Sequence, residues 1–430
     1  MKKSALSIAV ASMLAAPAAV AQTSNVQLYG RAVLGLDNYE AKGARSQGAV
    51  PGSAIDYDSR FRVYDNSSRV GLRGTEDLGN GLKAIFQIET GVNIDNGSNT
   101  GQSGGGNANT GFWAARDSFV GVDSNFGRLT FGRQSVYWAN GVNAQFSANY
   151  INSQVPWTDG TQLGRISRGP AGAISRYNNV VQYTSPTFAG INGTLSYSPT
   201  NQEAVQSSST TDTNGDMWGA TLRGTWGPFY AQADWARQKV GTPAAGGTAP
   251  FAAQGVTPEW EGYKLGASWG YLPGARIGVI WVRSESNAAL LTEVGANARQ
   301  DGWTINWEHT FGNFQALAQF GWTGDLSNCG SSGTPGVLGS SNNIAGAGAA
   351  TTVQSVSCAD TDATAFMVGG RYLLSKRTWV FASYNQVNNQ VNNFADFTGG
   401  SITSVAGNGT PLYPMGADPK LWAIGIFHQF

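Results

Sequence analysis

The stretch that decides the fold is LWAIGIFHQF, which occupies residues 421–430. Counting back from Phe430, every second position carries a bulky apolar or aromatic side chain: His428, Ile426, Ile424 and Trp422. A period of two places these side chains on one face of a β-strand. The ends of soluble domains tend to be polar and frayed, so a strand of this kind is typical of a sheet whose outer face meets lipid.

A sheet can cross a membrane only when its edges pair with each other. Lipid offers no partners to backbone N–H and C=O groups, so the last strand must bond to the first. The terminal strand therefore predicts a closed, all-β transmembrane barrel, with Phe430 at the end of the closing strand.

The first residues predict an export signal. Lys2 and Lys3 precede an apolar run at residues 5–16, and an Ala-x-Ala site follows at residues 19–21. This order is typical of a secretory signal peptide, and the run is too short to span a membrane as a helix. We expect residues 1–21 to be a signal peptide and residues 22–430 to form the barrel domain. A buried N-terminal helix is a weaker alternative, because no polar residues mark one face of it.

Composition narrows the class of protein. Charged residues make up only 13% of the chain, there are 58 glycines, and mean hydropathy is −0.22. After the signal, no run of about 18 apolar residues predicts a spanning helix. Without Lys2 and Lys3 the basic count falls from 27 to 25 against 27 acidic residues, a net charge of −2. A nucleic-acid-binding protein would need a basic excess, so that class is excluded.

Alternating segments recur along the chain and are separated by turn residues. Short turns are expected near residues 77–81, 125–127, 186–190, 227–228, 273–274, 312–313 and 375–377. Long connections lie between them, such as residues 96–111, 136–175, 199–215, 241–258, 325–362 and 389–419. Seven short turns and eight long connections predict sixteen antiparallel strands, a number that leaves room for an aqueous lumen.

The sequence offers no catalytic set and no metal-ligating cluster. Its two histidines, His309 and His428, fall on the expected lipid-side face, so a serine hydrolase is unlikely to be built here. The glycines at residues 104–106 lie in a loop and do not predict a phosphate site. Acidic residues at loop bases could bind calcium, but solvated loop charge explains them equally well: Asp212, Asp216, Asp360 and Asp362. We therefore expect no enzyme activity, no cofactor and no metal.

Arginines on the inner face are the candidate functional residues. Val70 and Leu72 face outward if the strand alternates, so Arg69 and Arg73 face the lumen. A group of guanidinium charges in water would create a positive field there.

Two further arginines are expected on the same wall. An outward Phe119 turns Arg116 inward, and an outward Val181 turns Arg176 inward. The spacing leaves two interpretations equally open. Either these arginines set a positive field in the pore, or they pair with Glu76, Asp77, Glu89 or Asp117 and stiffen the wall.

The connection at residues 136–175 is rich in aromatic side chains and carries Asp159, Arg165 and Arg168 as its charges. A loop of this length either stands outside the barrel or folds into it. Its apolar content favours folding inward, which would narrow the pore at the level of Arg69, Arg116 and Arg176.

The chain has 2 cysteines, Cys329 and Cys358, in one Gly/Ser/Ala-rich stretch. In an exported protein a single disulfide is the default, so we expect these two to pair and to pin a loop.

The motifs resemble one known family, the trimeric general-diffusion porins of Gram-negative outer membranes. They are VQLYG at residues 26–30, SRVGLRGTEDLGNGLKA at 68–84, FVG at 119–121, NFGRLTFGR at 125–133 and HQF at 428–430. The resemblance implies a sixteen-stranded barrel, a homotrimer, and a third extracellular loop folded into the pore as a constriction.

The resemblance also implies roles for particular residues. Arg69, Arg116 and Arg176 match wall arginines that face the constriction loop in anion-preferring members, and Phe430 resembles the signal read by the barrel-assembly machinery. We assign Arg133, Arg165, Arg168 and Asp159 to the same constriction. This loop offers the single carboxylate Asp159, where many relatives supply several, so a weaker transverse field is expected.

We therefore expect an outer-membrane channel for passive diffusion of small hydrophilic solutes and ions, with a mild anion preference. Its expected surroundings are outer-membrane lipid and lipopolysaccharide. A substrate-specific uptake channel is the alternative. An adhesin or a barrel enzyme would need a globular insert or a catalytic set, and the long loops offer neither.

Overall fold

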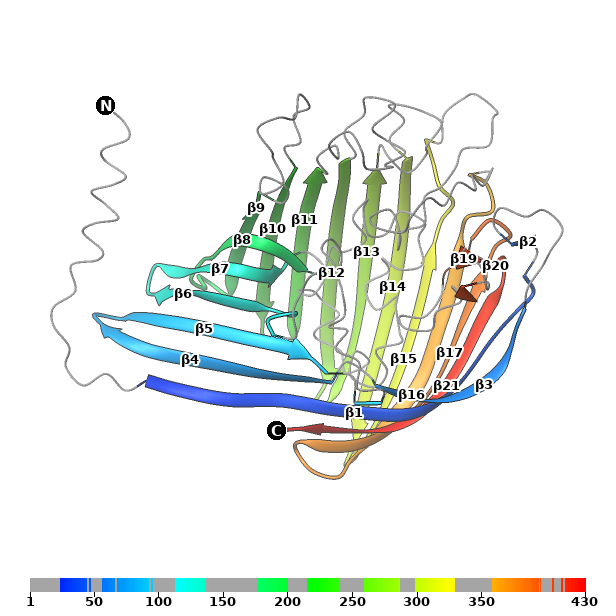
Figure 1. The fold of residues 1–430 in the computed structure, drawn as a ribbon, viewed down its shortest axis with the longest axis horizontal. Coiled ribbons are helices and arrows are strands. Elements are labelled where there is room, and N and C mark those ends of the chain that lie inside the picture. Colours follow the sequence, from blue (N-terminus) through cyan, green and yellow to red (C-terminus); the bar gives the residue numbers. More distant parts are fainter. Residues whose placement is uncertain are drawn as a thin grey trace.

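The computed structural model describes residues 24–44, 46–47, 56–65, 68–92, 94–95, 113–136, 176–199, 215–239, 259–286, 298–328, 358–393, 395, 404–405, 411–412 and 414–430. This part of the chain consists of strands, turns and irregular connections (Figure 1). No helix in it is long and apolar enough to cross a membrane.

The main strands are β1 (Ser24–Lys42), β3 (Tyr57–Asp65), β4 (Arg69–Gly79), β5 (Leu82–Gly91), β6 (Ser118–Ser124), β7 (Gly127–Ser135), β8 (Arg176–Thr184), β9 (Ile191–Ser198), β10 (Asp216–Trp226), β11 (Phe229–Lys239), β12 (Glu259–Leu272), β13 (Ala275–Ser286), β14 (Ala298–Phe311), β15 (Phe314–Thr323), β16 (Ala363–Leu373), β17 (Thr378–Asn389) and β21 (Asp418–Gln429). Four two-residue strands lie in the connections: β2 (Ser46–Gln47), β18 (Ser404–Val405), β19 (Pro411–Leu412) and β20 (Pro414–Met415).

The main strands form one closed antiparallel sheet. Its described part contains 17 strands, and apart from β3 and β4 consecutive strands pair with each other. β3 and β4 both pair with β1, one after the other, so they occupy a single position in the wall and sixteen positions remain. β21 returns to β1, with a register that runs from Arg31↔Gln429 to Lys42↔Asp418. The prediction of a sixteen-stranded barrel is confirmed, and a barrel of about this size encloses an aqueous lumen.

The seven short turns lie where the sequence placed them, all at one end of the barrel (Figure 1). Two-residue hairpins favour positive φ at the turn, which glycine adopts without a steric penalty. Gly227, Gly274 and Gly312 supply it with φ of 57°, 77° and 59°. The strand ends that border the long connections lie at the other end.

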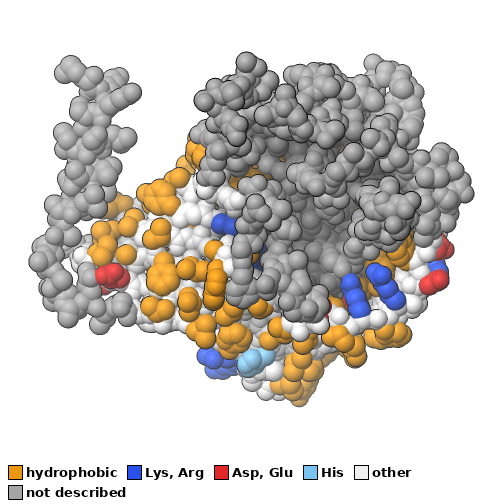
Figure 2. All heavy atoms as spheres, viewed as in Figure 1, with side chains coloured by type: hydrophobic (Ala, Val, Ile, Leu, Met, Phe, Trp, Pro, Cys, Tyr) orange, Lys and Arg blue, Asp and Glu red, His pale blue; other side chains and the backbone are white. Residues whose placement is uncertain are grey.

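Alternation along the strands separates an outer from an inner face. On β21, Trp422, Ile424 and Ile426 are 39%, 47% and 46% exposed, whereas Ala423 and Phe427 on the opposite face are buried. Hydrophobic side chains spread widely over the described outer surface (Figure 2). His309 and His428 share this outer face with their strand neighbours, as predicted.

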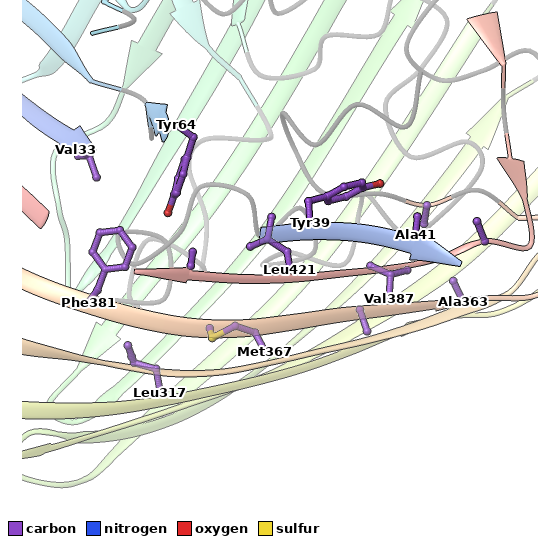
Figure 3. Close-up of a cluster of buried hydrophobic side chains, with 14 of the residues drawn as sticks. Val33, Tyr39, Ala41, Tyr64, Leu317, Ala363, Met367, Phe381, Val387 and Leu421 are labelled. Atoms are coloured by element: carbon purple, nitrogen blue, oxygen red, sulfur yellow. The ribbon is translucent and has the colours of Figure 1, made fainter. Parts of the chain in front are cut away.

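The inner face differs from the prediction on one side of the barrel. We expected a hydrated inner face throughout, and β10–β15 have one, with inward side chains such as Gln232, Asp234, Lys264, Thr304 and Asn306. On β16, β17, β21, β1 and β3 the inward side chains instead form a buried apolar cluster (Figure 3): Val33, Tyr39, Tyr64, Met367, Phe381, Leu421 and Phe427 among them.

The reason for this difference is that these strands carry apolar residues on both faces. Inward Met367 alternates with outward Val368, and inward Phe427 with outward Ile426. The inward side chains bury each other, and Trp379 stacks on Phe427 with ring centroids 3.7 Å apart. This apolar cluster therefore reinforces the β21–β1 junction from inside.

The stacked pair at this junction predicts a difference between neighbouring residues. Phe427→Ala removes a ring that is 3% exposed, so we expect the free energy of unfolding to fall by about 3–5 kcal/mol. Ile426→Ala trims an adjacent side chain that faces lipid and should cost less than half as much. Urea unfolding of the barrel in lipid vesicles measures both. Equal losses would show that the inner cluster does not stabilise the junction.

Candidate functional site

Glu89 on β5 gathers two of the predicted arginines. Its carboxylate lies 2.5 Å from Nε of Arg116 and 3.7 Å from Nη1 of Arg69. The hydroxyl of Tyr29 on β1 donates to the same carboxylate at 3.1 Å, and the Arg116 backbone N–H donates to the Glu89 carbonyl. Glu89 and Arg116 are almost fully buried, so each depends on the other for its charge to be tolerated.

Asp117 gathers the next part of the wall. Nε of Arg176 donates to its carboxylate at 3.2 Å. The backbone N–H and the hydroxyl of Ser135 donate to the other carboxylate oxygen at 2.6 and 2.7 Å. Asp117 thus joins the segment before β6 to the adjoining ends of β7 and β8.

Arg133 completes the described cluster through hydrogen bonds to neutral acceptors. Its Nε donates to the Ala115 carbonyl at 2.9 Å and its Nη1 to the Asn178 amide oxygen at 2.5 Å. The structure therefore brings Arg69, Arg116 and Arg176 together with Arg133 on one wall. We call these four residues the arginine cluster.

The orientation inferred for Phe119 was wrong. Phe119 pairs with Gln87, which faces inward, while its neighbours Val120 and Val122 are exposed on the outer face. Arg116 still reaches the lumen because it lies in a bend before β6, where Ala114 has a φ of 65°, and strand alternation does not apply. Arg116 therefore points inward as predicted, but the outward orientation of Phe119 from which this was inferred was wrong.

A β-bulge orients the end of the cluster. The pairing of β7 with β8 shifts register between Gly132 and Gln134, and Asn179 on the partner strand has a φ of 56°. An extra residue of this kind turns the following side chains away from simple alternation. Arg133 and Arg176 lie directly at this irregularity, which no period-two pattern could predict.

Tyr29 is a residue of the site that sequence reasoning missed. Its ring lies flat against Gly71, where a Cβ atom would come within 2.5 Å of the ring. The missing side chain at Gly71 lets Tyr29 lie between Arg69, Arg73 and Glu89. The sequence did contain a signal for this residue, since both Tyr29 and Gly71 belong to the motifs at residues 26–30 and 68–84.

The net charge of this wall is positive. Arg69, Arg116, Arg133 and Arg176 contribute four positive charges and Glu89 and Asp117 two negative ones, so the sum is +2. The structure thus shows the pairing of Arg69, Arg116 and Arg176 with Glu89 and Asp117, and the positive field in the pore stays a prediction.

The remaining predicted constriction residues, Asp159, Arg165 and Arg168, lie outside the described residues. The first residue of their connection is described. Val136 is buried and packs inward with Tyr177, Met217, Ala236 and Trp260 on the inner face of β8 and β10–β12. The first side chain after β7 thus points into the barrel.

The predicted disulfide lies only partly within the described residues. Cys358 is disulfide-bonded, and the chain's other cysteine, Cys329, lies outside the described residues. Shortly after Cys358 in the chain, the backbone N–H groups of Thr361 and Asp362 donate hydrogen bonds to the Asp325 carboxylate. Burial and the neighbouring Asp325 raise the pKa of Asp362. No group of three potential metal ligands occurs in the described part of the chain.

Comparison with known proteins is consistent with this architecture. A family model described as Gram-negative porin matches residues 5–392. The major outer membrane protein P.IB of Neisseria gonorrhoeae is 30% identical over 234 residues, which cover 54% of this chain and 56% of that protein. The chain thus spans about half the length of the curated relatives it matches.

Two solved structures share the fold at low identity. The anion-selective porin from Comamonas acidovorans superimposes with a TM-score of 0.63 at 20% identity, over 95% of this chain and 100% of that one. The trimer form of OmpT, an outer membrane protein of Vibrio cholerae, gives a TM-score of 0.55 at 13% identity, over 95% and 100% of the two chains.

The buried Glu89–Arg116 pair predicts a stability difference. Glu89→Gln leaves the almost fully buried Arg116 charge without its carboxylate, so we expect the barrel to lose about 3 kcal/mol. Asp123→Asn is the control, because its pair with Arg128 at the short-turn end is exposed and should cost less than about 1 kcal/mol. Urea unfolding in lipid vesicles compares the two variants. Equal small losses would mean that Arg116 is solvated in the pore.

Proposed function

The chain belongs to the Gram-negative porin family, and we propose that it forms a water-filled outer-membrane channel for passive diffusion of small hydrophilic solutes and ions. It acts by sieving and by electrostatic bias, without catalysis. The observation that carries this proposal is the closed barrel whose wall gathers Arg69, Arg116, Arg133 and Arg176 around Glu89 and Asp117, six residues whose charges sum to +2.

The proposal includes a mild preference for anions. An excess of positive charge on a wall raises the local concentration of anions and lowers that of cations. The fold neighbour from Comamonas acidovorans is described as anion-selective, which agrees with this sign. Arg69, Arg116, Arg133 and Arg176 are the residues we assign to this field, facing Arg165, Arg168 and Asp159 of the following connection.

We assign the size limit of the channel to residues 137–175, folded into the lumen. The inward packing of Val136 on Tyr177, Met217 and Trp260 supports this assignment, because the chain enters the connection already directed inside. A connection of this length that began on the outer rim would need no apolar contact with the inner wall.

A homotrimer is part of the proposal, and the outer face suggests where the copies meet. Tryptophan side chains face outward on β10–β15 and β21, for example Trp226, Trp269, Trp303 and Trp422. On the described outer face of β1 and β3–β7 the large side chains are aliphatic or Phe, such as Val26, Leu28 and Val120. Trp and Tyr mark the lipid interface, so the side that lacks them fits protein rather than lipid. The trimer form of OmpT is a precedent in this fold.

Three further parts of the proposal concern export and assembly. Residues 1–21 serve as a signal peptide, Phe430 is read by the barrel-assembly machinery, and outer-membrane lipid and lipopolysaccharide surround the barrel. A disulfide between Cys329 and Cys358 pins the loop that joins β15 to β16; the bonded state of Cys358 supports it.

The experiment is planar-bilayer recording on the purified channel. We expect the zero-current potential in a salt gradient to show anion preference, and joint replacement of Arg69, Arg116 and Arg176 by Gln to reduce it or reverse its sign. Unchanged selectivity would leave these arginines with a structural role alone.

Liposome swelling with sugars, amino acids and phosphate tests the general channel against the alternative. Uptake graded by size supports the proposal. Saturable uptake of one solute class would favour a substrate-specific channel.

A further inference from the structure

Among the described residues of β3, β4, β8 and the segment before β6, the arginines fall into two chemical classes. Arg62, Arg69, Arg116 and Arg176 contact carboxylates: Arg62 donates to both oxygens of Asp37 at 2.9 Å, and the others bind Glu89 or Asp117. Arg60 and Arg73 instead lie over tyrosine rings. Among the described residues, neither of these two forms an ion pair.

The two tyrosine-stacked arginines share one arrangement. The Arg73 guanidinium carbon lies 5.1 Å from the ring centroid of Tyr29, and its Nε donates to the Gln27 amide oxygen at 3.1 Å. The Arg60 guanidinium carbon lies 5.3 Å from the ring centroid of Tyr39. Both tyrosines come from the inner face of β1, so both arginines line the lumen.

Stacking and pairing leave different parts of a guanidinium available. A carboxylate takes the N–H donors on the edge of the group and cancels its charge. An aromatic ring takes only the flat face, so the charge persists and the edge can bind a second partner. Arg60 and Arg73 are also exposed, whereas the side chains of Arg116 and Arg176 are 7% and 11% exposed.

Their positions bracket the arginine cluster. β3 and β4 form one line along β1, with Arg60 toward the long connections and Arg73 toward the short turns. Thirteen positions separate the two, or roughly 40 Å along the strands at about 3.3 Å per residue. Arg69, which touches Glu89, lies between them.

We propose that Arg60 and Arg73 are the anion-binding stations of this channel, where small anions such as chloride contact guanidinium edges on either side of the paired arginines. The inference rests on the proposed function and refines it: the paired arginines hold the wall and contribute a background field, and the stacked ones exchange ligands with solution. Tyr29 and Tyr39 act as positioning residues that hold each charge against the wall without neutralising it.

The test is the zero-current potential of single channels in a potassium chloride gradient. Arg73→Gln and Arg60→Gln should each lower the chloride-to-potassium permeability ratio about two- to fourfold, the factor expected for a unit charge about 5 Å from an ion in water. Arg73→Lys keeps the charge and should retain most of the ratio.

Two controls separate stacking from charge and exposure. Arg62→Gln with Asp37→Asn removes a carboxylate-paired arginine next to Arg60 together with its partner, so the net charge does not change and the ratio should stay near the wild-type value. Arg128→Gln removes an exposed inward arginine that is paired with Asp123, and it should shift the ratio less than Arg73→Gln does. Heat-resistant migration on gels confirms that every variant is folded.

The outcomes distinguish this inference from the proposed function. A wild-type channel without anion preference would contradict the selectivity that we propose for the channel itself. A wild-type channel that prefers anions, with Arg60→Gln and Arg73→Gln unchanged, would overturn the inference alone. A greater loss in the Arg62–Asp37 double variant than in Arg73→Gln would also overturn it.

Discussion

Every feature of this protein depends on the requirement that no backbone hydrogen bond remain open to lipid. β21 satisfies it by pairing with β1 over the register from Arg31↔Gln429 to Lys42↔Asp418. This closure separates two solvents, so alternate residues on the same strand face hydrocarbon and lumen. It also explains why the apolar cluster around Phe427 and Trp379 lies on the inner face beside the junction. The last pairing joins the chain's most distant strands, and side-chain packing adds to the hydrogen bonds there.

Because the barrel is closed, a charged side chain on the inner wall affects the stability of the protein as well as its function. A guanidinium held against the wall loses part of its hydration, and the structure compensates this loss in three ways. Glu89 and Asp117 offset Arg116 and Arg176 with charge, Ala115 and Asn178 accept hydrogen bonds from Arg133, and Tyr29 offers Arg73 a ring. Full pairing would produce a stable but neutral pore, and no pairing would leave buried charges unsatisfied.

Much of the fold could be predicted from the sequence, because period-two alternation and turn residues are local signals. The turns at Gly227, Gly274 and Gly312 and the outward side of Trp422 follow from them directly. The site was predicted less completely. Arg116 stands before its strand, and a bulge beside Gly132 redirects Arg133, so alternation does not determine either direction. The partners of an arginine come from strands distant in sequence: 60 residues separate Tyr29 from Glu89.

Glycine at position 71 shows how a local choice controls a distant electrostatic effect. A side chain there would meet the Tyr29 ring at 2.5 Å and push it off the wall. The displaced ring would withdraw its hydroxyl from Glu89 and its face from Arg73, since both contacts need the ring flat against the strand. One absent methyl group thus allows a single tyrosine to support a paired arginine and a stacked arginine together. The charge pattern of the lumen is therefore set by packing on β1 and β4 as much as by the number of arginines.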